Sequence, residues 1–256
     1  MEKDLTRGKP ARVLLRFALP VIGGNLFQLF YTLADSVIVG RTLGADALAA
    51  VGSTSIIIYL VLCFIQGFTG GFGICLGQRF GAKDQSGMER SVRISWLLSL
   101  FFTVVLTAVC CLLAHPILRW MQTPDAIYAD AYDYMFVILL GTGATIFYNM
   151  ISNMLRALGD SRTPVIFLVV SSLGNVALDV LFIVPMKMGV AGAAVATVIS
   201  QLLSCVLSFW YMHKKYEFLR FSPRELRFEP KLARRVLTIG APMAVQQSVV
   251  SCGFMF

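Results

Sequence analysis

Long apolar runs separated by short polar segments repeat along the whole chain. Each run is at least as long as the roughly 20 residues that a helix needs to cross a bilayer. Each is also too evenly apolar for an amphipathic surface helix. Lipid offers no partner to free backbone groups, so such runs must be helices. The sequence therefore predicts an all-α polytopic transmembrane helix bundle. The predicted spans lie near residues 13–39, 46–78, 93–118, 128–156, 163–185 and 189–212.

The polar segments between the spans alternate in charge. All but three of the 22 basic residues lie in the N-terminal segment and in the segments that follow the second, fourth and sixth spans. The exceptions are Arg41, Arg119 and Lys187. Loops rich in lysine and arginine stay on the cytoplasmic side of a membrane. We therefore expect a multi-pass protein of the cell (inner) membrane whose N-terminus is cytoplasmic.

The overall composition agrees with a membrane protein and narrows the chemistry. Hydrophobic residues make up 57% of the chain and charged residues 14%, whereas soluble domains carry about 25% charged residues. The net charge of +8 is explained by topology and by contact with anionic membrane lipid. No basic stripe with interleaved aromatic residues indicates a nucleic-acid partner. The six cysteines lie inside apolar runs and the two histidines stand alone, so no cofactor and no metal other than sodium is expected.

A short pattern near the start of the chain recurs near its end. The first span contains Leu14–Pro20 followed by Asn25, and the last apolar run contains the similar Val236–Pro242 followed by Gln247. Six crossings return the chain to the side on which it began, so a second unit would have the same orientation as the first, as in parallel repeats. The pattern indicates that a second unit begins close to residue 234.

We accordingly divide the chain into three parts. Residues 1–212 form an N-terminal six-helix lobe, residues 213–233 form a linker, and residues 234–256 form the start of helix seven of a second lobe. The linker is basic with interspersed phenylalanine and leucine, which is typical of an amphipathic segment at the cytoplasmic interface. The chain is then part of a transporter, and the second lobe of the same full-length protein is its partner. The alternative is a complete seven-helix protein.

Two aspartates stand inside the predicted spans, Asp35 in the first and Asp179 in the fifth. A carboxylate within a span costs roughly 2.5–3.5 kcal/mol on insertion scales, so such residues usually face the bundle interior or a water-filled cavity. Asn175 precedes Asp179 by four residues and shares its helix face. Two buried carboxyls close together could take up a proton or share a monovalent cation. For Asp35, the alternative is a position near the outer end of its helix in contact with lipid headgroups.

Other residues within the spans indicate bends, packing and a cavity. Pro20 removes a backbone donor and should kink the first span, either as a hinge or as a fixed bend. In the second span, Gly67-x-x-x-Gly71 and Gly73-x-x-x-Gly77 are small-residue patterns for close helix packing. Five polar residues are candidates to line a substrate cavity or to bridge two helices. They are Gln28, Tyr31, Asn149, Asn153 and Gln201.

A series of motifs, taken in order along the chain, resembles one family of transporters. They are Ala18–Tyr31, Asp35–Arg41, Leu43 with Gly44, Ala49–Gly52, Gly77–Ala82, Leu155–Asp160 with Pro164, and Gly192–Gln201. Their combined order resembles the multidrug and toxic compound extrusion (MATE) family, most closely its bacterial and archaeal DinF-like and NorM-like members. The resemblance covers essentially the whole chain.

This resemblance implies a fold, an activity and a site. The family has twelve helices in two six-helix lobes and exports cationic amphiphiles by alternating access, driven by inward proton or sodium flow. In several members, an aspartate of helix one joins an asparagine and an aspartate of helix five and a threonine of helix six in a cation site. The matching motif positions here are Asp35, Asn175, Asp179 and Thr197. The resemblance leaves the choice between proton and sodium open.

Two other functions are alternatives to a cation-coupled exporter. A lipid-linked saccharide flippase of the same superfamily would need a cavity rich in arginine and lysine to hold pyrophosphate, and apart from Arg16 the first two spans are poor in such residues. An intramembrane enzyme would need a nucleophile with a base, a metal cluster or a catalytic pair. The two aspartates could imitate an aspartyl dyad, but they lack recognisable flanking chemistry, so we do not expect an enzyme.

Overall fold

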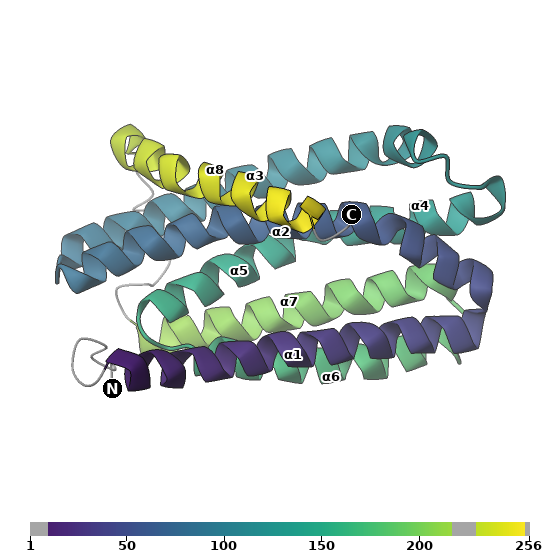
Figure 1. Ribbon diagram of the computed structural model, residues 1–256, viewed down its shortest axis with the longest axis horizontal. Helices are drawn as coiled ribbons and strands as arrows, with labels where there is room; N and C mark the ends of the chain where they lie inside the picture. The colour runs from purple at the N-terminus through teal and green to yellow at the C-terminus, as the bar shows by residue number, and fades with distance from the viewer. Residues whose placement is uncertain (1–9, 217–228, 254–256) are drawn as a thin grey trace.

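The computed structural model describes residues 10–216 and 229–253, and within these residues every regular element is an α-helix (Figure 1). The predicted all-α bundle is thereby confirmed. Most of the predicted linker, residues 217–228, lies outside the described residues. The helices are α1 (Pro10–Leu43), α2 (Ala45–Gly81), α3 (Gln85–Trp120), α4 (Asp125–Leu140), α5 (Thr142–Ala157), α6 (Arg162–Ile183), α7 (Gly189–Lys215) and α8 (Pro230–Gly253).

The fourth predicted span is broken into two helices. By length and apolar composition, α1, α2, α3, α6 and α7 can each cross a membrane, and α4 and α5 can make a further crossing together, bent by 43° at a short break. Gly141 stands at this break, where a side chain would collide with Val198 of α7. Glycine weakens a helix interior, and here it also lets the junction pack directly on α7.

Several helices start earlier than the hydropathy predicts, and α3 and α8 do so by the most residues. Helix α3 begins at Gln85 instead of residue 93, because the Asp84 carboxylate caps it by accepting a hydrogen bond from the Gly87 backbone N–H at 2.9 Å. This backbone hydrogen bond is the main cause that lowers the pKa of the Asp84 carboxyl. Helix α8 begins at Pro230 instead of residue 234, and proline is well tolerated in a first helical turn. Most of the residues added to α3 are polar, so hydropathy does not mark them.

Helix α2 lies at the centre of the bundle and contacts α1, α3, α4, α5 and α8, whereas α6 and α7 pack on each other and α1 lies against them (Figure 1). Large apolar side chains point outward, such as Leu112 at 77% exposure and Phe30 at 67%, as expected where lipid is the solvent. Helix α1 continues through Pro20 without interruption. The expected kink therefore does not break the helix, and the hinge role of Pro20 stays a prediction.

Glycines bring α2 and α8 into backbone contact. A Cβ atom on Gly67 would lie 2.5 Å from the Ala244 Cα, and one on Gly71 would lie 2.6 Å from the Gly240 Cα. Neither position has room for a side chain. The small-residue pattern in α2 therefore serves close helix packing, as predicted. The helix packed against it is α8, which contains the repeated pattern Val236–Pro242.

Candidate functional site

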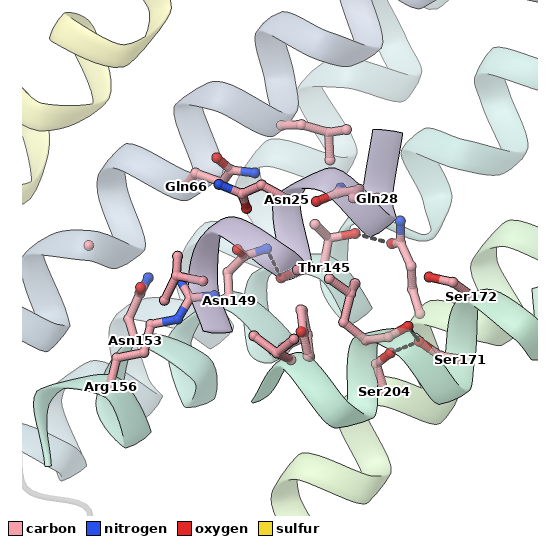
Figure 2. A pocket seen from close by; sticks show the side chains of 18 of the residues that line it. Asn25, Gln28, Gln66, Thr145, Asn149, Asn153, Arg156, Ser171, Ser172 and Ser204 are labelled. Carbon is pink, nitrogen blue, oxygen red and sulfur yellow. Dashed lines mark hydrogen bonds between the residues drawn. The ribbon is translucent and has the colours of Figure 1, made fainter. Parts of the chain in front are cut away.

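A cavity of about 540 Å³ opens between the helices, lined from α1, α2, α5, α6, α7 and α8 (Figure 2). All five residues predicted to face a cavity line it, namely Gln28, Tyr31, Asn149, Asn153 and Gln201. Their contact with a substrate stays a prediction. Asn25, Gln66 and Gln246 add further neutral amides, so the walls offer many donors and acceptors with little fixed charge.

Several of these amides also tie helices together. The Asn153 side-chain amide of α5 donates to the Thr69 hydroxyl of α2 at 3.2 Å. The Thr145 hydroxyl of α5 donates to the Gln201 carbonyl of α7. Asn153 and Gln201 therefore do both things that the sequence offers as alternatives: they line the cavity and they bridge two helices. The bridges hold the cavity wall in place.

The four residues of the predicted cation site converge from three helices. Asp35 of α1 is 8% exposed, and on α6 Asn175 is 1% exposed and Asp179 is fully buried. Thr197 of α7 is 8% exposed. The burial of Asp35 rules out the alternative in which its carboxylate contacts lipid headgroups. The Asp35 and Asp179 carboxyls lie within hydrogen-bonding reach of each other.

Asn175 is held between its two neighbours. With its amide in the orientation that satisfies both of them, Asn175 donates to Asp179 Oδ2 at 3.2 Å and accepts from the Thr197 backbone N–H at 3.1 Å. The i,i+4 spacing of Asn175 and Asp179 places the amide beside the carboxylate, as the sequence predicts. The site thus offers carboxylate and hydroxyl oxygens, which are ligands that a hard cation prefers, while the Asn175 amide positions Asp179.

The two carboxyls have incomplete protein partners. Asp35 Oδ1 and Asp179 Oδ1 are buried without a hydrogen-bond partner among the described residues, and no described lysine or arginine forms a salt bridge with either aspartate. Two negative charges cannot be held together away from water at low cost. The arrangement therefore suits the uptake of a proton or of a monovalent cation, either of which would reduce the charge and satisfy the free oxygens.

Two tyrosines complete the surroundings of the site. Tyr31 of α1 lies beside Thr197 and interacts electrostatically with both aspartates. Tyr134 of α4, which is 8% exposed, interacts with both aspartates and with Tyr31. Sequence reasoning placed Tyr31 only in the cavity and missed Tyr134, whose hydroxyl within an apolar run was the one available signal.

The predicted cation site and the cavity share a wall. Tyr31, Asn175 and Thr197 line the cavity. Asn175 donates to Asp179 and accepts from the Thr197 backbone N–H, and Tyr31 interacts electrostatically with both aspartates. Asp35 and Asp179 themselves lie just behind these three residues. A molecule in the cavity would therefore meet the neighbours of the aspartates, and a change at the aspartates would be felt at the cavity wall.

Comparison with known proteins shows which family the chain resembles. The MatE family model matches residues 20–181. The chain is 33% identical over 253 residues to the probable multidrug resistance protein YpnP of Bacillus subtilis, covering 98% of this chain and 56% of that protein. It is 28% identical to the probable multidrug resistance protein NorM of Thermotoga maritima, covering 94% of this chain and 53% of that protein.

Solved structures give the same result. The crystal structure of MATE in the bent conformation superposes with a TM-score of 0.89 at 27% identity, and the match covers 98% of this chain and 56% of that one. The chain thus spans just over half the length of the relatives it matches. Family model, relatives and fold agree, and the chain belongs to the MatE family, the multidrug and toxic compound extrusion (MATE) transporters, which are membrane transport proteins and not enzymes.

Proposed function

We propose that this chain provides the cation-coupling part of an antiporter that exports cationic amphiphilic compounds by alternating access. The observation that carries the proposal is the buried carboxyl pair of Asp35 and Asp179, which lacks a basic partner among the described residues and shares a wall with an amide-lined cavity. The coupling ion is a proton or sodium, bound between α1 and α6. The second lobe of the full-length protein completes the transport path.

The carboxyl pair can couple an ion to a movement because it joins two helices. Without a bound cation, Asp35 on α1 and Asp179 on α6 repel each other in a desolvated place. A bound proton or sodium removes that repulsion and stabilises the packing of α1 against α6 and α7. An ion that binds one arrangement of the helices better than another shifts the equilibrium between them. This differential binding is what an antiporter requires.

The cavity suits an organic substrate of moderate size. Its volume of about 540 Å³ lies within the range of about 300–1,000 Å³ that is usual for small-molecule sites. The neutral amides can solvate a polar group without fixing one substrate, which agrees with relatives named as multidrug resistance proteins. These relatives do not favour a lipid-linked saccharide flippase.

Gradient-driven transport by proteoliposomes that contain the full-length protein tests the proposal. Asp35→Asn keeps the side-chain volume but can neither release a proton nor balance the charge of sodium. We expect it to lower gradient-driven efflux of a cationic dye by about tenfold or more, because a charged partner of a buried site is lost. Asp46→Asn is the matched control, because Asp46 is exposed in the first turn of α2, and it should transport like the wild type.

The same preparation separates the two coupling ions. A sodium gradient at equal pH and a proton gradient without sodium are imposed in turn, and the ion that drives efflux is the coupling ion. Unchanged transport by Asp35→Asn under the driving gradient would contradict the proposal, and so would a wild-type protein that responds to neither gradient.

A further inference from the structure

One cationic side chain stands in the otherwise neutral wall of the cavity. Arg156 lies in the last turn of α5, half-buried, and Figure 2 shows it near Asn153 among the lining residues. Among the described lining residues, it is the only one that is ionised at neutral pH. The proposed cation-coupling function gives this guanidinium no role.

Arg156 lacks a counter-charge among the described residues. Its Nε is buried without a hydrogen-bond partner. Asp160, the acidic residue nearest in sequence, is already engaged, because its carboxylate accepts from Lys215 at 3.0 Å, from Tyr211 at 2.9 Å and from the Thr163 hydroxyl at 2.9 Å. The neighbouring Tyr148 donates its own hydroxyl to the Pro164 carbonyl at 3.0 Å. No acceptor among the described residues therefore forms a hydrogen bond with the Arg156 guanidinium.

The carboxyl pair is too far away to serve as that counter-charge. Thr145, which bonds to Gln201 one turn from Thr197, precedes Arg156 by three turns of α5, or about 16 Å along the helix axis. The cavity thus has an acidic site behind one end and a guanidinium at the other. A half-buried guanidinium that lines a cavity and has no partner among the described residues can bind a group of opposite charge there.

Guanidinium chemistry defines what such a group binds. Its planar fork of N–H donors matches a carboxylate or phosphate group with two parallel hydrogen bonds. We propose that Arg156 forms an anion subsite of the cavity, which takes the carboxylate or phosphate of an amphiphile that also carries a positive charge. The inference rests on the proposed function, whose substrates are otherwise cations. A single guanidinium accommodates one such oxyanion.

The test compares two dyes that differ in one group. A rhodamine with a free carboxyl group is a zwitterion, whereas its methyl ester is a cation of nearly the same size. Equilibrium binding of each dye to the purified full-length protein is measured by fluorescence anisotropy, and efflux of each dye is measured in proteoliposomes. The variants are Arg156→Gln, which removes the charge, and Arg156→Lys, which keeps the charge without the fork. Arg162→Gln is the matched control, because Arg162 is an exposed arginine at the start of α6 outside the cavity.

We expect Arg156→Gln to weaken binding of the acid dye by about tenfold or more, the loss usual for a hydrogen bond to a charged group. Arg156→Lys should restore part of it. Binding of the ester should stay within about twofold in both variants, and Arg162→Gln should resemble the wild type. Equal losses for acid and ester would overturn the inference and assign Arg156 a structural role. Unchanged binding of both dyes would also overturn it.

Two further arms keep the conclusions separate. In the first, anionic phosphatidylglycerol is titrated into the binding assay. Displacement of the acid dye from the wild type but not from Arg156→Gln would show that the subsite also accepts a lipid phosphate. The shared chemistry of carboxylate and phosphate predicts this result. Efflux of the ester by the wild type tests the proposed antiport without Arg156. If that efflux fails while acid binding still depends on Arg156, the proposed function falls and the anion subsite stands.

Discussion

At the scale of single residues, Asp160 is the best connected carboxylate in the described structure. It lies in the turn between α5 and α6 and accepts hydrogen bonds from Thr163 at the start of α6 and from Tyr211 and Lys215 at the end of α7. Burial on its own raises the pKa of the Asp160 carboxyl, but these hydrogen bonds outweigh it, so the net pKa is lowered. One ionised side chain thus joins the ends of three helices.

We expect Asp160→Asn to destabilise the protein at pH 7 by about 1–3 kcal/mol, the usual contribution of hydrogen bonds to a charged group. The pKa of Asp160 is depressed in the folded state, so its contribution is fully present above the ordinary aspartate pKa of about 3.9 and is lost as the pH falls through the lower folded value. The melting temperatures of variant and wild type, followed by tryptophan fluorescence, should therefore converge only in acid.

The control for this prediction is Asp130→Asn, since Asp130 is an exposed aspartate of α4. It should melt like the wild type at both pH values. A melting difference for Asp160→Asn that stays the same down to strongly acidic pH would show that ionisation of Asp160 is not what stabilises this turn.

Residues of the site differ in how visible they are in the sequence. Asp35 and Asp179 could be singled out because a carboxylate inside an apolar run is a costly exception. Tyr134 could not, because a tyrosine in such a run is ordinary. The i,i+4 spacing predicts that Asn175 and Asp179 share a face, but no spacing within one helix reports that α1 and α7 bring Asp35 and Thr197 to that face. The convergence of these residues follows only from the resemblance to a family and is seen directly only in the folded structure.

At the scale of helices, the close contact between α2 and α8 is formed at glycines that the small-residue pattern singles out. We expect Gly71→Ala to push α8 away from α2, because the added methyl group would meet the Gly240 backbone at 2.6 Å. Overpacking of this kind costs about 1–3 kcal/mol. Hydrogen–deuterium exchange over residues 230–253 should accelerate, and the melting temperature should fall.

Gly52→Ala is the matched control on the same helix. A Cβ atom on Gly52 meets nothing within 4 Å, so this variant should be neutral, or stabilised by about 0.5–1 kcal/mol through higher helix propensity. If Gly71→Ala exchanges no faster over α8 than Gly52→Ala does, the backbone contact does not hold α8 in place.

Hydropathy has a clear limit at this scale. It predicts where a helix crosses lipid, but it missed the break at Gly141, because the residues on both sides of the break are apolar or small. It also missed the first turns of α3, where Asp84 starts the helix with a polar cap. Neighbouring helices could not be assigned either, since a leucine against lipid and a leucine against another helix look alike in sequence.

At the scale of the whole molecule, the distribution of charge predicts an orientation that the fold alone leaves open. The turn between α2 and α3 follows Arg79 and contains Lys83, whereas the turn between α3 and α4 carries only Arg119 beside it. The positive-inside rule assigns the first turn to the cytoplasm and the second to the outside. The two turns lie at opposite ends of α3, so one experiment on both fixes the orientation of the bundle.

Single cysteines at Ala82 and Ala126 provide that experiment, because both alanines are exposed and lie at opposite ends of α3. We expect a membrane-impermeant maleimide to label Ala126→Cys on intact cells and to label Ala82→Cys only after permeabilisation. The native cysteines set the background, which is measured on the wild type. The reverse labelling pattern would show that the bundle has the opposite orientation in the membrane. It would then place the end of α5 that carries Arg156 on the outer side, so that the anion subsite would meet substrates from the exterior instead of from the cytoplasm.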